Sequence, residues 1–305
     1  MNNYNLLKEN LKDTYCIILE DEPMSKHTTF KIGGQADIFI KVNNQKDLQQ
    51  VLKLCLQYNM DTFILGRGSN LLVSDLGIRG VVIKLEDKFC DVELLEGNKV
   101  HCGAGASLAK LCMFALNNSL SGLEFAWGIP GSVGGAAYMN AGAYNGEMKD
   151  VILNCTHITP KGVIETVSGD DLKLSYRHSV YSDNDNIILS VVLQLKNDLY
   201  EDIRYRMDDF MQRRKSKQPL ECPSAGSVFK RPIGHFAGQL IEQCGLKGKS
   251  VGGAMVSDIH AGFIINKGNG TCRDGLDLID VVKTEVKSKT GVSMQCEVKP
   301  VGDFS

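Results

Sequence analysis

The sequence has almost no charge excess, no long apolar run and no closely spaced cysteine pair. Its 305 residues include 34 Lys and Arg against 36 Asp and Glu, for a net charge of -2. It therefore lacks the basic field of a nucleic-acid-binding protein. No apolar run approaches the roughly 20 residues that span a membrane, so we expect no membrane insertion. Residues 1–10 are polar and lack the apolar stretch of a secretory signal, which predicts a cytoplasmic protein.

The 10 cysteines are spread along the chain and contain no C-x-x-C pair. A structural zinc site needs closely spaced ligands, and the histidines show no ligand spacing either, so we predict no metal site. Cys55, Cys112 and Cys244 fall on apolar helix faces. We expect them to be reduced thiols in the core.

Hydrophobic periodicity predicts a mixture of helices and strands. Residues 36–42 and 62–65 have the pattern of strands. Asn44 is placed to cap a helix whose apolar face would hold Leu48, Val51, Leu52, Cys55 and Leu56. Ser107 is placed to cap a second helix, with an apolar face made of Leu108, Leu111, Cys112, Ala115 and Leu116.

Two glycine-dense loops are the most informative feature of the chain. Residues 66–70 have the sequence G-R-G-S-N, and residues 128–135 have the sequence G-I-P-G-S-V-G-G. Backbone with few side chains lets a large ligand approach peptide N–H groups, which can cradle phosphate oxygens. Neither loop is a G-x-G-x-x-G dinucleotide motif or a Walker A loop, and a single glycine turn is often purely structural. Two such loops in one chain favour a diphosphate-bearing cofactor.

Further motifs resemble those of one enzyme family. In chain order they are H-T-T-F-K-I-G-G at 27–34, G-R-G-S-N-L-L at 66–72, G-L-E-F at 122–125 with the loop at 128–135, S-Y-R-H-S at 175–179, P-S-A-G-S-V-F-K at 223–230, and Glu297. Together they resemble the UDP-N-acetylenolpyruvoylglucosamine reductase family, in its compact subgroup without the inserted lid that carries a substrate-clamping tyrosine. The G-S-N loop by itself is shared with a broader group of flavin oxidases.

The resemblance implies an α+β fold. This fold combines a two-part FAD-binding region of the vanillyl-alcohol-oxidase (PCMH) type with a C-terminal α/β substrate-binding domain. The predicted FAD-binding subdomains are residues 1–85 and 86–215, and the substrate domain is 216–305, whose last residues are free to return to the first subdomain. Pro219 and Pro223 mark a linker close to the last boundary from composition alone.

The resemblance also implies the reaction and its small-molecule partners. The protein would reduce UDP-N-acetylglucosamine enolpyruvate to UDP-N-acetylmuramate with NADPH, through bound FAD, in bacterial peptidoglycan precursor synthesis. We expect a monomer. Tyr176 and Lys230 are implied to bind substrate. The residues implied to contact FAD are Gly66, Arg67, Gly68, Ser69, Asn70, Leu71, Gly128, Ile129, Pro130, Gly131, Ser132, Gly134, Gly135, Asn140, Ala141, Gly142, Tyr144 and Gly146.

Three catalytic residues are implied by the same motifs. Arg177 would bind the substrate carboxylate or enolate through its planar guanidinium. Ser227 would deliver the proton to carbon. Glu297 would be protonated, with a raised pKa, and would donate a hydrogen bond. Local sequence alone allows plainer roles: an exposed turn for Arg177, a turn cap for Ser227, and the polar face of a predicted last strand at 292–298 for Glu297.

Two other functions are compatible with the glycine loops. One is an FAD-linked oxidase of the same superfamily that acts on an alcohol or sugar with oxygen. The other is a non-catalytic nucleotide-binding sensor. Neither explains why Arg177, Ser227 and Glu297 occur in their motif contexts, so the reductase is the preferred hypothesis.

Overall fold

The computed structural model describes residues 3–305, so the first two residues of the predicted first subdomain lie outside the described residues. The chain forms two compact units. Within the described residues, the first contains 3–20, Ile38–Arg67 and Gly80–Gln212, and the second contains Asp21–Asp37, Gly68–Arg79 and Arg213–Ser305. The division falls inside helix α5 (Tyr200–Lys217) and not at the prolines that predict a linker. The further split of the FAD-binding region into 1–85 and 86–215 stays a prediction.

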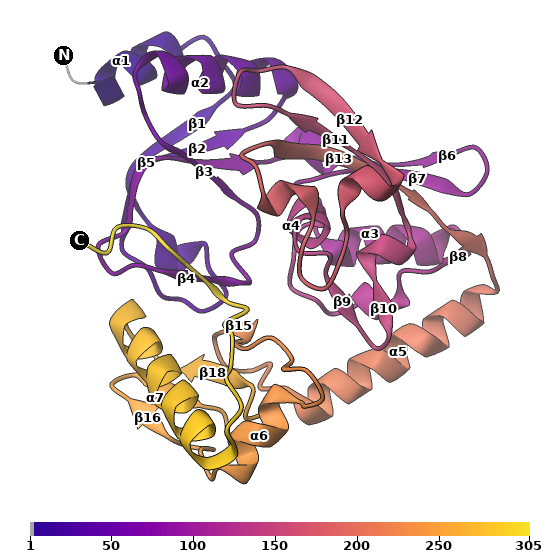
Figure 1. Cartoon of the computed structure of the whole chain (residues 1–305). Helices are drawn as coiled ribbons and strands as arrows, with labels where there is room; N and C mark the ends of the chain where they lie inside the picture. Colours follow the sequence, from indigo (N-terminus) through magenta and orange to yellow (C-terminus); the bar gives the residue numbers. More distant parts are fainter. Residues whose placement is uncertain (1–2) are drawn as a thin grey trace. The chain divides into compact units, whose positions relative to one another are not determined.

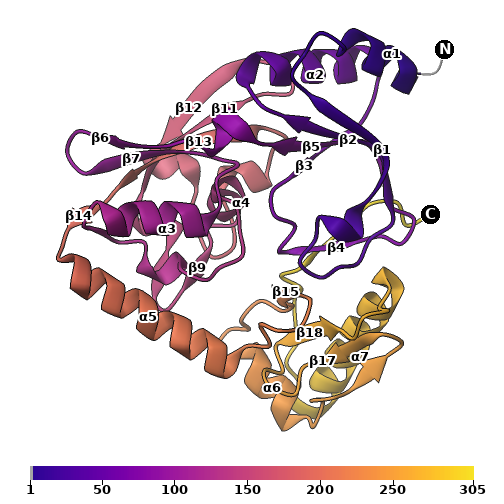
Figure 2. The ribbon, with the colours of Figure 1, turned by 180° about the vertical axis from the view of Figure 1, so that it is seen from behind.

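A four-stranded sheet near the N-terminus has the strand order β1-β2-β5-β3. Its strands are β1 (Ile17–Pro23), β2 (Gln35–Val42), β5 (Ile78–Leu85) and β3 (Thr62–Leu65). Strands β3 and β5 are parallel, with Thr62 opposite Val81. Helices α1 (Asn3–Asn10) and α2 (Gln45–Gln57) pack side by side (Figures 1 and 2).

The first unit also holds an antiparallel five-stranded sheet in the order β12-β11-β13-β7-β6. These strands are β12 (Ile164–Ser168), β11 (Ile152–Ile158), β13 (Ile187–Gln194), β7 (Lys99–Gly103) and β6 (Val92–Leu95). Helix α4 (Val133–Tyr138) packs on β13 and β7, and helix α3 (Leu108–Asn117) packs on α4 (Figure 1). Two short strand pairs complete the unit: β9 (Gly142–Ala143) with β10 (Gly146–Glu147), and β8 (Leu120–Ser121) with β14 (Lys196–Asn197).

The second unit contains a small sheet in the order β15-β18-β17-β16. Its strands are β15 (Ser224–Ser227), β18 (Phe263–Asn266), β17 (Ala254–Val256) and β16 (Ser250–Val251). Helix α7 (Cys272–Thr290) packs on β16 and β17 and contacts helix α6 (Ala237–Gln243). The last strand, β19 (Lys299–Val301), pairs in parallel with β4 (Leu71–Val73), which lies within the range predicted for the first subdomain.

Short 3-10 helices connect these elements. They are η1 (Met24–Lys26), η2 (Asp87–Cys90), η3 (Glu124–Ala126), η4 (Met148–Asp150), η5 (Gly169–Leu172) and η6 (Val180–Ser182). Each unit has its own hydrophobic core, one running from Leu7 to Met207 and the other from Phe30 to Val298. No helix among residues 3–305 is both long and apolar enough to cross a membrane.

The helix predictions from capping are confirmed. The Asn44 side chain accepts a hydrogen bond from the Asp47 N–H at the start of α2, and Ser107 accepts one from the Lys110 N–H at the start of α3. Cys55, Cys112 and Cys244 are buried, as predicted. The prediction for Leu56 is wrong, because its side chain is 65% exposed. The buried face of α2 includes Leu54 instead, which lies three residues after the buried Val51, and residues three or four apart share a helix face.

The predicted strand at 292–298 is also wrong as a strand. In that segment only Cys296 makes a β-bridge, with Phe229, and the strand proper is β19 at Lys299–Val301. Apolar and polar side chains still alternate, because Met294 and Val298 are buried while Ser293 and Gln295 are exposed. The alternation of apolar and polar residues therefore predicts which side chains are buried. A strand also requires a neighbouring segment that pairs continuously with its backbone groups.

Candidate active site

The first glycine loop follows β3 directly and leaves three backbone donors unengaged. Among the described residues 3–305, none accepts a hydrogen bond from the N–H groups of Arg67, Gly68 and Ser69. Gly68 has φ +61°, and a Cβ there would lie 2.3 Å from the His27 carbonyl oxygen, so only glycine fits this turn. Consecutive free N–H groups in a glycine turn form an anion-binding concavity. The loop therefore fits the diphosphate of FAD.

The two glycine loops meet within the first unit at Gly66 and Ser132. A Cβ on Gly66 would lie 2.4 Å from the Ser132 Oγ. Ser132 also caps α4, where its Oγ accepts a hydrogen bond from the Gly135 N–H at 3.3 Å. The Val133 and Gly134 N–H groups donate to the carbonyls of Ala106 and Ala104, both at 2.8 Å. In the second loop, small residues thus allow close packing, while most of the N–H groups are already engaged.

Asn70 connects the first loop to the segment that carries Glu297. Its side-chain amide donates to the Glu297 carbonyl at 3.2 Å, and its own carbonyl accepts from the Lys299 N–H at 3.0 Å. The Asn70 amide thus fixes backbone next to a predicted catalytic residue. Its implied contact with FAD stays a prediction.

The β9–β10 hairpin follows the second loop and holds several residues that were implied to contact FAD. Asn140, just before it, has φ +41° and is fully buried. Its amide donates to the Glu147 Oε2 at 2.6 Å and to the Ser175 carbonyl at 3.0 Å, and its Oδ1 accepts from the Lys149 N–H at 2.8 Å. At the hairpin tip, the Tyr144 ring stacks on Phe210 of α5, with 4.5 Å between ring centroids.

Arg177 lies on a tight two-residue turn. Ser175 and His178 exchange two backbone hydrogen bonds of 3.1 Å, which leaves Tyr176 and Arg177 at the turn. Arg177 has φ +57°, a left-handed conformation that costs a non-glycine residue roughly 1–2 kcal/mol. Its Nη2 donates to the Gly142 carbonyl at 3.4 Å, and its guanidinium carbon lies 5.0 Å from the centroid of the Tyr176 ring. The guanidinium is therefore held by both the hairpin and its neighbouring ring.

Ser227 and Glu297 both belong to the second unit, and backbone pairing brings their segments together. The Glu297 N–H donates to the Val228 carbonyl at 2.7 Å, and the Lys230 N–H donates to the Gln295 carbonyl at 2.9 Å. Ser227 ends β15 opposite Phe263, after an irregularity in the pairing at which Gly226 has φ +74°. Such a bulge turns the next side chain away from the regular sheet pattern, and the Ser227 side chain is exposed. Lys230, which is implied to bind substrate, lies half-buried on this same paired segment.

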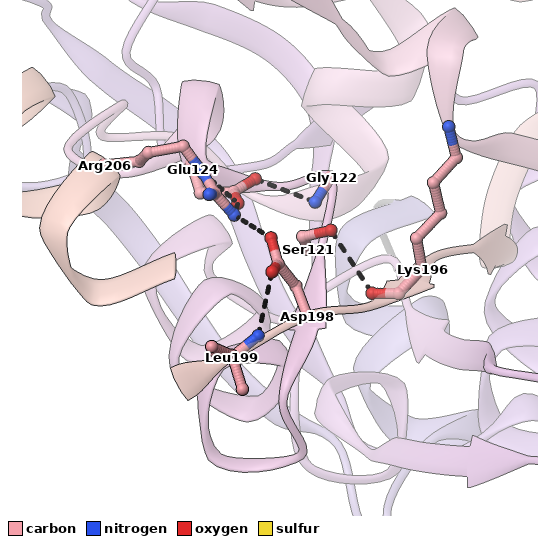
Figure 3. Close-up of polar contacts among 7 residues, drawn as sticks. All are labelled: Ser121, Gly122, Glu124, Lys196, Asp198, Leu199 and Arg206. Carbon is pink, nitrogen blue, oxygen red and sulfur yellow. Dashed lines mark hydrogen bonds and ion pairs between the residues drawn. The ribbon is translucent and has the colours of Figure 1, made fainter. Parts of the chain in front are cut away.

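A charged cluster supports the turn before the second loop, and sequence reasoning gave it no role (Figure 3). Glu124, in the G-L-E-F motif, is buried and accepts hydrogen bonds from Arg206 Nε at 3.0 Å and Nη2 at 2.7 Å. Its other oxygen accepts from the Gly122 N–H at 2.8 Å. Arg206 also bonds Asp198 at 2.5 Å, and this pairing holds the pKa of Asp198 below its usual value. The cluster attaches α5 to the segment leading into residues 128–135.

Asn140, Glu124 and Arg206 are the structural residues whose roles the sequence did not reveal. The family motifs imply only an FAD contact for Asn140, and they include Glu124 without giving it a role. The contact from Asn140 to Ser175 spans 35 residues and the contact from Arg206 to Glu124 spans 82, so no local spacing pattern could have identified these two contacts.

Comparisons with known proteins match nearly the whole chain. Residues 218–301 match the family described as UDP-N-acetylenolpyruvoylglucosamine reductase, C-terminal domain, and residues 36–168 match the FAD binding domain family. Among relatives named UDP-N-acetylenolpyruvoylglucosamine reductase, that of Clostridium novyi is 51% identical, covering 92% of this chain and 91% of the relative. The relative of Syntrophomonas wolfei is 47% identical, covering 93% and 94%.

Solved structures agree with these matches. The crystal structure of the UDP-N-acetylenolpyruvylglucosamine reductase from Thermus caldophilus has a TM-score of 0.80 and 33% identity, covering 93% of this chain and 98% of that one. A VAO-type flavoprotein from Myceliophthora thermophila has a TM-score of 0.50 at 12% identity, over 64% of this chain and 47% of that one, and shows the fold alone. The predicted fold class is confirmed. The chain belongs to the UDP-N-acetylenolpyruvoylglucosamine reductase family.

Proposed function

We propose that this protein reduces UDP-N-acetylglucosamine enolpyruvate to UDP-N-acetylmuramate with NADPH, in peptidoglycan precursor synthesis. Family membership over more than nine-tenths of the chain supports this reaction. One observation supports the residue assignment: the exposed residue Ser227 directly precedes Val228, whose carbonyl pairs with the Glu297 N–H. The distant VAO-type flavoprotein shares the fold alone and therefore gives no support to the oxidase hypothesis.

Bound FAD supplies hydride transfer from NADPH to the enolpyruvyl double bond. The first loop, residues 66–71, would hold its diphosphate through the free N–H groups of Arg67, Gly68 and Ser69. The second loop would let the cofactor approach the backbone closely, because its glycines carry no side chains. The hairpin residues Gly142 and Gly146 would line the flavin.

The protein's own residues bind, orient and protonate the substrate. Arg177 would bind the substrate carboxylate with two parallel hydrogen bonds and stabilise the negative charge that develops there. Ser227 would give the second hydrogen as a proton to the carbon next to the carboxylate. Glu297 would stay protonated and donate a hydrogen bond, since an ionised carboxylate would repel the developing charge. Tyr176 and Lys230 would bind the rest of the substrate.

Replacing Ser227 by Ala tests this assignment. Anaerobic stopped-flow absorbance separates flavin reduction by NADPH from flavin reoxidation by the enolpyruvyl sugar. The variant should retain the first half-reaction and slow the second by about 10²–10⁴-fold, because only the second needs the proton. Ser224→Ala, on the same strand, is the matched control and should leave both unchanged. Equal slowing of both half-reactions would contradict the role of Ser227, and reoxidation by oxygen but not by the sugar would favour the oxidase.

We further propose that the protein acts as a monomer in the bacterial cytoplasm. The placement follows from the peptidoglycan-precursor reaction proposed above. Light scattering on the purified protein should give the chain mass of 33.5 kDa. A mass of twice that value would rule out the monomer.

A further inference from the structure

Asn140 is a buried polar side chain with all of its hydrogen-bonding groups in use. Its amide makes two donor contacts, to Glu147 and to the Ser175 carbonyl, and its oxygen accepts from the Lys149 N–H. The side chain has no exposed surface. A buried amide with partners in two segments, residues 147–149 and Ser175, fixes these segments relative to one another, because losing any partner would leave a buried polar group unsatisfied.

Two of these contacts lead to Arg177 by separate routes. The first passes through the turn: Ser175 exchanges two backbone hydrogen bonds with His178, so holding the Ser175 carbonyl fixes the strained turn that carries Arg177. The second passes through the hairpin: Glu147 lies opposite Gly142 in the β9–β10 pair, and the Gly142 carbonyl accepts a hydrogen bond from Arg177 Nη2. Asn140 therefore fixes the backbone of Arg177 and also the carbonyl that orients its guanidinium.

We propose that Asn140 is the positioning residue for Arg177, setting where the guanidinium meets the anionic end of the substrate. This inference rests on the proposed role of Arg177. An arginine that binds a planar carboxylate with two hydrogen bonds requires its guanidinium to be accurately placed and aligned. Asparagine suits the position, since it tolerates left-handed backbone and offers both donors and an acceptor.

The test compares Asn140→Asp with Asn98→Asp in the FAD-loaded enzyme. Aspartate also tolerates left-handed backbone and keeps an oxygen that accepts from the Lys149 N–H. It removes the amide N–H groups that donate to Glu147 and to the Ser175 carbonyl. Asn98 also has left-handed backbone, with φ +59°, in the β6–β7 hairpin, and so serves as the matched control. Because the new carboxylate would face Glu147, a second variant combines Asn140→Asp with Glu147→Gln, whose amide can donate to it. In that variant the contact to the Ser175 carbonyl remains lost, and it replaces the single variant if the latter fails to fold or to retain FAD.

Two measurements are made in the wild-type and in an Arg177→Lys background: binding of the enolpyruvyl sugar to the oxidised enzyme by calorimetry, and the two flavin half-reactions by stopped flow. Asn140→Asp should weaken sugar binding and slow reoxidation by the sugar, each about tenfold or more, and should change reduction by NADPH by less than about twofold. In the Arg177→Lys background, Asn140→Asp should change sugar binding and the reoxidation rate by less than about twofold further. The two effects are not additive, because Asn140 acts through Arg177. Asn98→Asp should change neither quantity.

Equal effects of Asn140→Asp in both backgrounds would overturn the inference, as would equal slowing of both half-reactions. If Arg177→Lys slows reoxidation while Asn140→Asp does not, only the positioning role fails. If Arg177→Lys leaves binding and reoxidation unchanged, the proposed role of Arg177 fails, and the inference falls with it.

Discussion

Arg177 and Asn140 both adopt left-handed backbone, with φ of +57° and +41°. Asparagine enters this region readily, whereas arginine does so only where surrounding contacts hold it. The turn hydrogen bonds of Ser175 and the contact with Gly142 supply that constraint. Strained residues of this kind cluster at active sites and ligand-binding turns, in agreement with the role proposed for Arg177.

Burial of single thiols leads to a prediction about cysteine reactivity. Burial raises the pKa of Cys55, Cys102, Cys155 and Cys272 to about 12. Because the thiolate is the reactive form, its fraction at these sites should be about 10³-fold lower than for a free cysteine. Maleimide labelling of the native protein at pH 8, followed by mass spectrometry, should mark the half-buried Cys222 and Cys296 well before these four. In urea all ten should react alike, and equal native labelling of Cys55 and Cys296 would contradict the prediction.

Among the elements of the fold, helix α5 is held by an ion-pair cluster in which Arg206 bonds Glu124 and Asp198 (Figure 3). Arg206→Gln should lower the free energy of unfolding by about 1–2 kcal/mol, because it leaves Glu124 buried without its charged partner. Arg204→Gln on the same helix is the control, since its bond to Asp208 joins two exposed side chains. Urea denaturation followed by circular dichroism should show a change for the first variant alone. Equal urea midpoints for Arg206→Gln and Arg204→Gln would show that the cluster adds no stability.

The start of helix α7 should make stability depend on pH. The Asp274 carboxylate accepts hydrogen bonds from the N–H groups of Gly253 and Thr271, both at 3.0 Å, and these hold its pKa below the usual value. With a lowered pKa, the folded state binds fewer protons than the unfolded state. This stabilisation is therefore present above the unfolded pKa of about 3.9 and is lost as pH falls through the folded pKa.

Asp274→Asn should reduce stability at neutral pH by about 0.5–1 kcal/mol, because the amide oxygen can still accept hydrogen bonds but the negative charge at the start of α7 is lost. The difference from wild type should shrink as pH falls below about 4. Thermal unfolding across a pH series checks this. Asp277→Asn, one turn further on and paired with Arg273 at the surface, should follow the wild-type pH curve. A constant deficit for Asp274→Asn at every pH would rule out the charge effect.

Cofactor binding gives a prediction for the whole molecule. The three free N–H groups of the first loop fit a diphosphate, so FAD should stabilise flavin-free protein more than riboflavin, which lacks that group. At a concentration about 100 times its Kd, FAD should contribute about 2.7 kcal/mol. Thermal shift measurements with FAD, FMN and riboflavin at matched concentrations test this. If riboflavin gave the same shift as FAD, the loop would not be the diphosphate site.

Local features of this fold could be predicted, because they depend on residues close in sequence. The caps at Asn44 and Ser107 follow from side chains that reach N–H groups three residues ahead. Helix faces follow from the 3.6-residue period, although Leu56 shows that the exact edge of a face depends on what packs there. The predicted strand at 292–298 was wrong because a strand exists only where another segment pairs with it.

The sequence by itself determined the helix positions, the buried cysteines and, through the order of its motifs, the family. Only the tertiary structure decided which distant segments meet. It joined Gly66 to Ser132, paired the segments of Ser227 and Glu297, and gave Asn140 its partners beside Arg177. Helical bonds close over four residues and leave a periodic trace in the sequence. Contacts between distant segments leave no such trace, since any compatible side chain can make them once the chain has folded.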